Sequence, residues 1–224
     1  MIPIRDMIPT RRVPVVNYLL IVINVIVFIF EWLAGANQDA LVAQFALVPA
    51  NVTAGLDAGD IRDVFTSMFM HAGFLHLAGN MLYLWIFGDN VEDAMGSLKY
   101  LLFYLAGGVA AAFTHVLINP NSTLPTVGAS GAIAAVLGAY IVLYPHSRVL
   151  TFIPIGYFMR LTPVPAYLVL GLWFVLQLFS GVTSLGAADV GGTAFWAHIG
   201  GFVFGLVFGK LLTLGRRPES TLTW

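Results

Sequence analysis

Long apolar stretches separated by short polar connections dominate the pattern of this chain. A helix needs about 20 mostly apolar residues to cross the hydrocarbon core of a membrane, and six stretches approach that length. We therefore expect an all-α membrane protein with six membrane-spanning helices. The expected spans are 13–34, 68–88, 98–118, 127–145, 164–180 and 194–214.

The connections between the spans differ in composition. Apolar residues at helical spacing in the connection 35–67 predict a short helix at the membrane interface. The connection 146–163 is interrupted by prolines and is expected to be a loop, whereas four glycines make 181–193 the most mobile connection. Since no linker, repeat or shift in composition divides the chain, we expect a single domain over 1–224.

The basic residues predict how the chain lies in the membrane. With the N-terminus inside, nine of the ten Lys and Arg residues fall on the cytoplasmic side, and only Arg62 falls outside. Because basic residues concentrate in cytoplasmic loops, both termini are expected in the cytoplasm. The span 13–34 is longer than the apolar core of a signal peptide, so we expect it to be retained. We place the protein in the plasma membrane.

Composition supports a membrane protein and excludes several other classes. Charged residues make up 9% of the chain, against roughly 25% in soluble domains, and the mean hydropathy is +0.88. A net charge of −1 offers no basic field for nucleic acid, so no nucleic-acid partner is expected. The absence of cysteine excludes disulfides and thiolate-bound metals.

Two polar residues stand near the starts of apolar stretches. Ser130 lies in Gly-Ala-Ser-Gly at 128–131, and His198 lies in Ala-His-Ile-Gly-Gly at 197–201. Polar side chains inside membrane segments are functional candidates. Without cysteine, a hydroxyl nucleophile with an imidazole base is the Ser/Cys-type acyl-transfer chemistry open to this chain.

A second polar pair opens the second span. His76 and Asn80 are one turn apart on one helix face, whereas His71 is rotated away and suits a structural or rim position. The second, fourth and sixth spans all run inward, so His76, Asn80, Ser130 and His198 share a similar depth. We expect them to form one site.

Small residues on the fourth and sixth spans would let these two helices approach closely. Gly128 and Gly131 flank the serine. The stripes are Ser130, Ala134 and Gly138 on the fourth span and Ala197, Gly201, Gly205 and Gly209 on the sixth.

Other chemistries fit less well. An isolated serine in a membrane helix usually bonds to its own backbone, and a lone histidine can be a packing residue. His71 and His76 lack the intervening glutamate of a His-Glu-x-x-His zinc site, and Asp89 has no aspartate partner. His115 and His146 are assigned structural positions. We expect no metal and no cofactor.

The ordered motifs resemble the rhomboid intramembrane serine proteases over nearly the whole chain. They are Met-Ile-Pro-Ile-Arg-Asp at 1–6, Phe-Thr-Ser-Met-Phe-Met-His at 65–71, the turn from His76 to Asn80, Gly-Asp-Asn-Val-Glu-Asp-Ala-Met-Gly at 88–96, and the two segments around Ser130 and His198.

The resemblance implies a six-helix bundle around a water-filled cavity that opens to the outside. It implies that Ser130 is the nucleophile and His198 the base, and that His76, Asn80 and the Ser130 amide form the oxyanion hole. No carboxylate is placed to orient His198, so a dyad is expected. Many relatives carry an aromatic residue where this chain has Ala134, which leaves the imidazole less firmly held.

We therefore predict a serine endopeptidase that cleaves single-span membrane proteins within the bilayer, near the outer face. One alternative is an inactive rhomboid-like protein that binds membrane clients, although such proteins usually lack the serine or the histidine. Another is a channel or transporter with a histidine proton relay, which would need ionisable residues at several depths.

Overall fold

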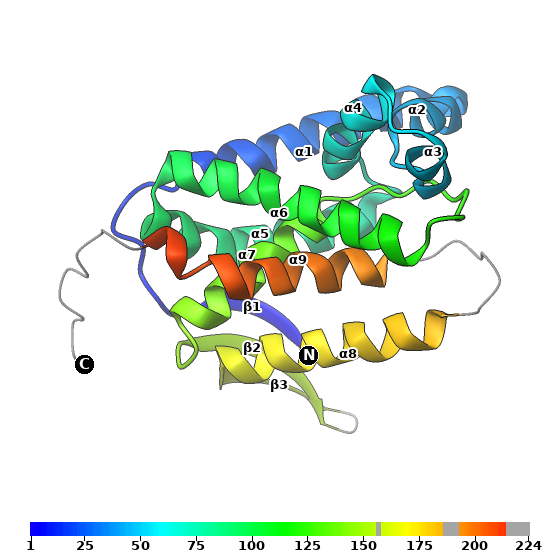
Figure 1. Cartoon of the computed structure of the whole chain (residues 1–224). Helices are drawn as coiled ribbons and strands as arrows, with labels where there is room; N and C mark the ends of the chain where they lie inside the picture. Colours follow the sequence, from blue (N-terminus) through cyan, green and yellow to red (C-terminus); the bar gives the residue numbers. More distant parts are fainter. Residues whose placement is uncertain (156–157, 186–192, 214–224) are drawn as a thin grey trace.

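The structure is a computed structural model, and it describes residues 1–155, 158–185 and 193–213. Each of the six predicted apolar stretches overlaps in sequence with one long helix (Figure 1). They are α1 (Val15–Leu33), α5 (Phe74–Met95), α6 (Ser97–Ile118), α7 (Ser130–Leu143), α8 (Ala166–Ser184) and α9 (Phe195–Phe208). Among the described residues, α1, α6 and α8 are long and apolar enough to cross a membrane, while α7 and α9 are apolar but shorter.

Helix α5 departs most from its predicted bounds. It begins after Gly73 and continues through the polar motif to Met95, where Gly96, with a φ of +83°, ends it. The polar residues remain helical because they have partners. Glu92 accepts hydrogen bonds from the backbone N–H groups of Val16 at 3.1 Å and Asn17 at 2.7 Å. This contact joins the start of α1 to the end of α5.

The connection 35–67 folds into three short helices rather than the one predicted. They are α2 (Gln38–Phe45), α3 (Pro49–Ala54) and α4 (Ala58–Thr66). Three-residue 3₁₀ turns occur at Gly35–Asn37, Ser67–Phe69 and Leu211–Thr213. Most of the predicted mobile connection, 186–192, lies outside the described residues.

The prediction of an all-α protein is wrong in one region. Strands β1 (Ile2–Asp6), β2 (Arg148–Ile155) and β3 (Phe158–Pro165) form an antiparallel sheet in the order β1-β2-β3. The predicted loop 146–163 is therefore largely a hairpin. Proline is tolerated here because one side of its backbone needs no ladder partner. Pro163 and Pro165 lie on the edge strand β3, and Pro154 lies on β2 beyond the residues that pair with β1.

Helix α7 forms the centre of the helical bundle. It packs against α9, α6 and α5, and the residues from Gly131 to Tyr140 are all buried. Helix α8 runs along one flank of the bundle, beside β2 and β3 (Figure 1). The first residue of this central helix, Ser130, is half-buried, and the residues before and after it, Ala129 and Gly131, are buried.

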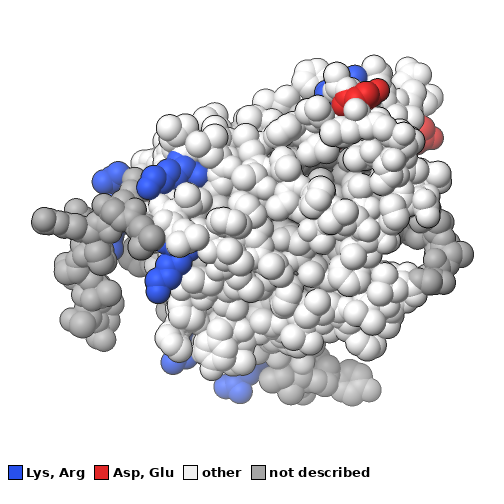
Figure 2. Space-filling model, in the orientation of Figure 1, with Lys and Arg blue, Asp and Glu red and all other residues white. Residues whose placement is uncertain are grey.

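Charged side chains lie at the two ends of the bundle. In Figure 2 most of the visible Lys and Arg side chains lie toward one end, and the acidic side chains lie at the opposite end next to a smaller basic patch, with a nearly uncharged surface between the two ends. The acidic end includes the surface ion pair between Arg62 and Asp63, at 2.8 Å. An uncharged belt between charged ends is the surface expected of a protein embedded in lipid.

Candidate active site

The turn before α7 fixes the position of Ser130. Gly128 has a φ of +136°, a backbone conformation that residues with a side chain rarely adopt. Its N–H donates to the Ser67 carbonyl at 2.8 Å, and a Cβ on Gly128 would lie 2.8 Å from the His76 ring. The glycine thus lets the backbone pass the histidine and start α7 at Ser130.

Ser130 and His198 are brought together as predicted, although 68 residues separate them. The Ser130 Oγ lies 2.7 Å from the His198 Nε2, and His198 is 8% exposed. A hydroxyl that donates to a neutral imidazole nitrogen is the ground state for proton abstraction. The pair therefore has the geometry of an activated serine nucleophile.

Backbone contact between α7 and α9 makes this hydrogen bond possible. A Cβ on Gly201 would collide with the carbonyl oxygen of Gly131, and a Cβ on Gly205 would collide with that of Ala135. A Cβ on Gly138 would likewise collide with the carbonyl oxygen of Phe202. At these three glycines the backbones of α7 and α9 approach more closely than any side chain would allow, which is the kind of contact that stripes of small residues permit.

His76 and Asn80 line the same cavity as the Ser–His pair. This site cavity has a volume of about 920 Å³. Asn80 is 8% exposed, and its Nδ2 has no hydrogen-bond partner among the described residues. A buried amide without an acceptor is unfavourable in a resting protein. It is suited to an oxygen atom that acquires negative charge only during a reaction.

His71 lies outside the lining of the site cavity, in a buried position. It is 1% exposed, its ring lies 5.2 Å from the His76 ring in an edge-on arrangement, and its backbone N–H donates to Glu31 at 3.1 Å. His71 can therefore support the His76 ring, and the structural or rim role given to it stays a prediction.

Two residues of α8 contact His198 and were missed by the sequence reasoning. The His198 Nδ1 lies 2.8 Å from the Gln177 Oε1, and the Trp173 ring lies 5.8 Å from the imidazole with a 34° tilt. Gln177 is a polar residue within an apolar stretch. The signal that singled out Ser130 could therefore have found it.

His115 was assigned a structural position, but it lines the site cavity. Its Nε2 lies 3.1 Å from the Thr126 Oγ1, and its Nδ1 lies 3.3 Å from the Asn119 side-chain amide. These contacts tie the end of α6 to the segment that leads into α7. His146 contacts Tyr167 edge-on, at 5.9 Å between ring centroids.

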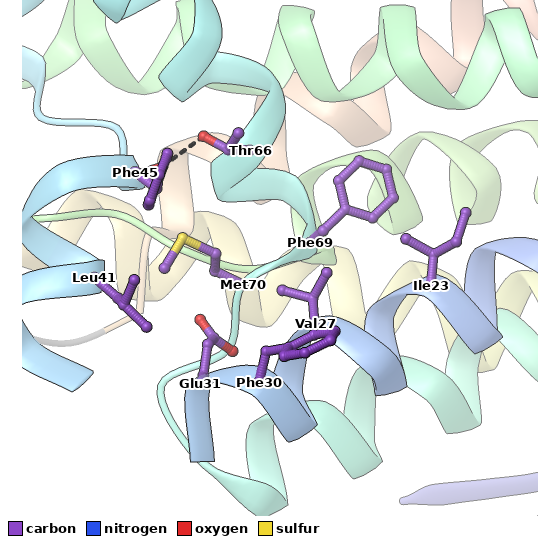
Figure 3. A pocket seen from close by; sticks show the side chains of 9 residues that line it. All are labelled: Ile23, Val27, Phe30, Glu31, Leu41, Phe45, Thr66, Phe69 and Met70. Atoms are coloured by element: carbon purple, nitrogen blue, oxygen red, sulfur yellow. Dashed lines mark hydrogen bonds between the residues drawn. The ribbon is translucent and has the colours of Figure 1, made fainter. Parts of the chain in front are cut away.

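A second pocket of about 310 Å³ shares no lining residue with the site cavity. Figure 3 shows Glu31 among apolar side chains from α1, α2 and the segment after α4. The hydrogen bond drawn there runs from the Thr66 hydroxyl to the Phe45 carbonyl at 2.7 Å. None of its lining residues forms a nucleophile–base pair, so the candidate chemistry belongs to the site cavity.

Three comparisons with known sequences are informative. The chain is 30% identical over 148 residues to Rhomboid protein 1, mitochondrial, of Saccharomyces cerevisiae. The aligned region covers 64% of this chain and 39% of the yeast protein. It is 29% identical over 203 residues to Rhomboid protease GluP of Bacillus subtilis, and the aligned region covers 90% of this chain and 35% of that protein. It is 26% identical over 218 residues to the human Presenilin-associated rhomboid-like protein, mitochondrial, and the aligned region covers 92% of this chain and 51% of the human protein.

These relatives correct one prediction. The yeast and human proteins, and the related zebrafish protein, are named as mitochondrial, which contradicts the predicted plasma-membrane location. Composition and loop charge define a membrane protein but contain no information about which membrane holds it.

The chain spans about a third to a half of the length of these relatives. The family model for the Rhomboid domain matches residues 58–215, more than half of the chain. The matched region contains His76, Asn80, Gln177 and both members of the Ser130–His198 pair. This chain belongs to the rhomboid family.

Proposed function

We propose that this chain is an intramembrane serine endopeptidase with Ser130 as nucleophile and His198 as base. The 2.7 Å contact between the Ser130 Oγ and the His198 Nε2 inside the site cavity carries this proposal. The family name of the Bacillus subtilis relative, Rhomboid protease GluP, supports it.

The reaction begins with attack of the Ser130 Oγ on the scissile carbonyl carbon, while His198 takes the hydroxyl proton. The tetrahedral intermediate then loses its amine, which takes that proton from His198, and an acyl-serine ester remains. Water then attacks the ester carbonyl while His198 accepts a proton from that water. The bond to the Ser130 Oγ breaks, His198 returns the proton to this oxygen, and the carboxylic acid product leaves.

The oxyanion would be met by donors from two helices. The Asn80 Nδ2 and the His76 ring lie on α5, and the Ser130 N–H is at the first residue of α7, where helical N–H groups have no partner within the helix. The positive end of the helix dipole at this point favours the same negative charge. One oxyanion donor is worth about 3–4 kcal/mol.

We propose that all six long helices span the membrane as a single domain. Both termini would lie on the side where basic loops collect. The site cavity would then open toward the opposite side, and water needed for deacylation would enter there. Single-span membrane proteins would be the substrates, and because a substrate helix hides its carbonyls in its own hydrogen bonds, it must unwind before attack.

Labelling with a fluorophosphonate probe tests the proposed nucleophile. Wild-type protein should be labelled covalently, Ser130→Ala should not be, and His198→Ala should react far more slowly. A folded wild-type protein that neither reacts nor cleaves would favour the alternative, an inactive family member that binds membrane clients.

A further inference from the structure

The two nitrogens of the His198 ring contact two different helices. The Nε2 faces Ser130 on α7, and the Nδ1 lies 2.8 Å from the Gln177 Oε1 on α8. The second contact belongs to no part of the dyad described above. It bears directly on which nitrogen of the imidazole carries the hydrogen.

Only one tautomer of His198 can act as the base. A neutral imidazole has one N–H, and the Nε2 must be free of hydrogen to accept the Ser130 proton. The hydrogen then lies on the Nδ1, where a buried donor needs an acceptor. The Gln177 Oε1 is such an acceptor. If the glutamine presented its NH₂ group instead, the hydrogen would move to the Nε2 and the base would be blocked.

Trp173 restricts the same ring from a second direction. It lies one turn before Gln177, on the same face of α8, with its ring 5.8 Å from the imidazole. It also contacts Phe202 of α9 at 5.9 Å. Ala134 of α7, where the sequence lacks the aromatic residue expected from the resemblance, is fully buried beside Gly201. In this chain the aromatic surface comes from α8.

We propose that Gln177 is a positioning residue that selects the reactive tautomer of His198, and that Trp173 limits rotation of its ring. This inference rests on the proposed function. It makes α8 a part of the catalytic apparatus even though neither side chain touches the reacting atoms. A neutral amide fixes the hydrogen without the strong stabilisation of the protonated ring that a carboxylate would add.

The test measures cleavage of a single-span substrate in proteoliposomes between pH 5 and 9, with kcat and KM determined separately. Gln177→Leu keeps the side-chain size but removes the acceptor, so kcat should fall about tenfold to a hundredfold while KM changes less than twofold. Gln177→Glu restores an acceptor and should retain most of kcat at high pH. The low-pH limb of its profile of kcat against pH should move to higher pH, because the carboxylate stabilises the protonated imidazole.

Val175→Leu is the matched control, since Val175 lies on the same helix and is 57% exposed; it should leave both constants unchanged. The positioning role would be overturned if Gln177→Leu kept the wild-type kcat. It would also be overturned if both glutamine variants lost kcat equally and the low-pH limb of Gln177→Glu did not shift. Should Gln177→Leu fail to fold, the pH limb of Gln177→Glu decides alone. Retained cleavage by Ser130→Ala would instead reject the proposed function itself.

Discussion

At the scale of single residues, Asn80 combines a buried position with an amide nitrogen that lacks a partner among the described residues. Asn80→Ala should lower kcat about 10²–10³-fold with little change in KM, because the missing interaction forms only in the transition state. Its thermal stability should not fall, since no hydrogen bond of the Nδ2 is lost. Steady-state cleavage and a melting curve measure both effects, and a variant that loses substrate affinity but keeps its turnover would contradict this role.

The residue scale also shows how far the sequence could lead. Ser130, His198, His76 and Asn80 could be predicted because each is polar, near the start of an apolar stretch and at a common depth. Gln177 is also polar and lies near the outer end of its predicted stretch, 164–180, so its polarity and depth mark it as a candidate, but they do not show that it contacts His198. That connection depends on how α8 is rotated and placed against α9, which only the packed structure reveals.

At the scale of elements, the contact between α7 and α9 determines the distance between serine and histidine. Gly201→Ala would push a methyl group against the Gly131 carbonyl, so we expect a loss of about 1–3 kcal/mol in stability and a large loss of activity. Gly171→Ala on α8 is the matched control, because nothing lies within 4 Å of its added methyl group. Melting temperature and cleavage rate should separate the two variants, and equal behaviour would show that the close approach is unimportant.

The strand β1 is attached to the bundle through a buried carboxylate. Asp6 accepts hydrogen bonds from the Asn90 Nδ2 at 2.7 Å and the Tyr140 hydroxyl at 2.8 Å. Burial raises the pKa of Asp6 from 3.8 to about 6, even though the bond from Tyr140 opposes this rise. Because the folded protein then binds this proton more tightly than the unfolded chain, the group's contribution to stability is greatest below about pH 4. It falls as the pH rises to about 6.

Asp6→Asn should therefore reduce the loss of melting temperature between pH 4.5 and pH 7, because the amide oxygen can still accept both hydrogen bonds but cannot ionise. The exposed Asp39 provides the control: Asp39→Asn should leave this difference as in the wild type. If Asp6→Asn and the wild type lose stability equally over this range, the buried carboxylate is not responsible.

The elements were predicted unevenly for physical reasons. Apolar stretches of helical length identify the long helices, because burial in lipid or in the bundle requires them. The sheet was missed because prolines in 146–163 indicate a loop. Strands accept proline where one side of the backbone is unpaired, as at Pro163 on β3 and at Pro154, beyond the residues of β2 that pair with β1. The pairing of β1 with β2 joins residues such as Ile2 and Phe152, and no local pattern encodes such a distant contact.

At the scale of the whole molecule, the proposed six-span arrangement places the two charged ends on opposite sides of the membrane. The chain has no cysteine, so single introduced cysteines can report their side. Asn121→Cys and His146→Cys replace exposed residues in different connections. An impermeant maleimide added outside sealed vesicles should label only one of them, and detergent should expose the other. Labelling of both in sealed vesicles would contradict the arrangement.

The central claim is that the Ser130–His198 pair cleaves membrane-embedded substrates. The most direct measurement compares wild-type protein, Ser130→Ala and His198→Ala in proteoliposomes that contain a single-span substrate, with folding checked by melting temperature. Wild-type protein should release two fragments whose new ends lie within or next to the substrate's membrane segment, and both variants should be folded but inactive. Undiminished cleavage by Ser130→Ala would contradict the claim.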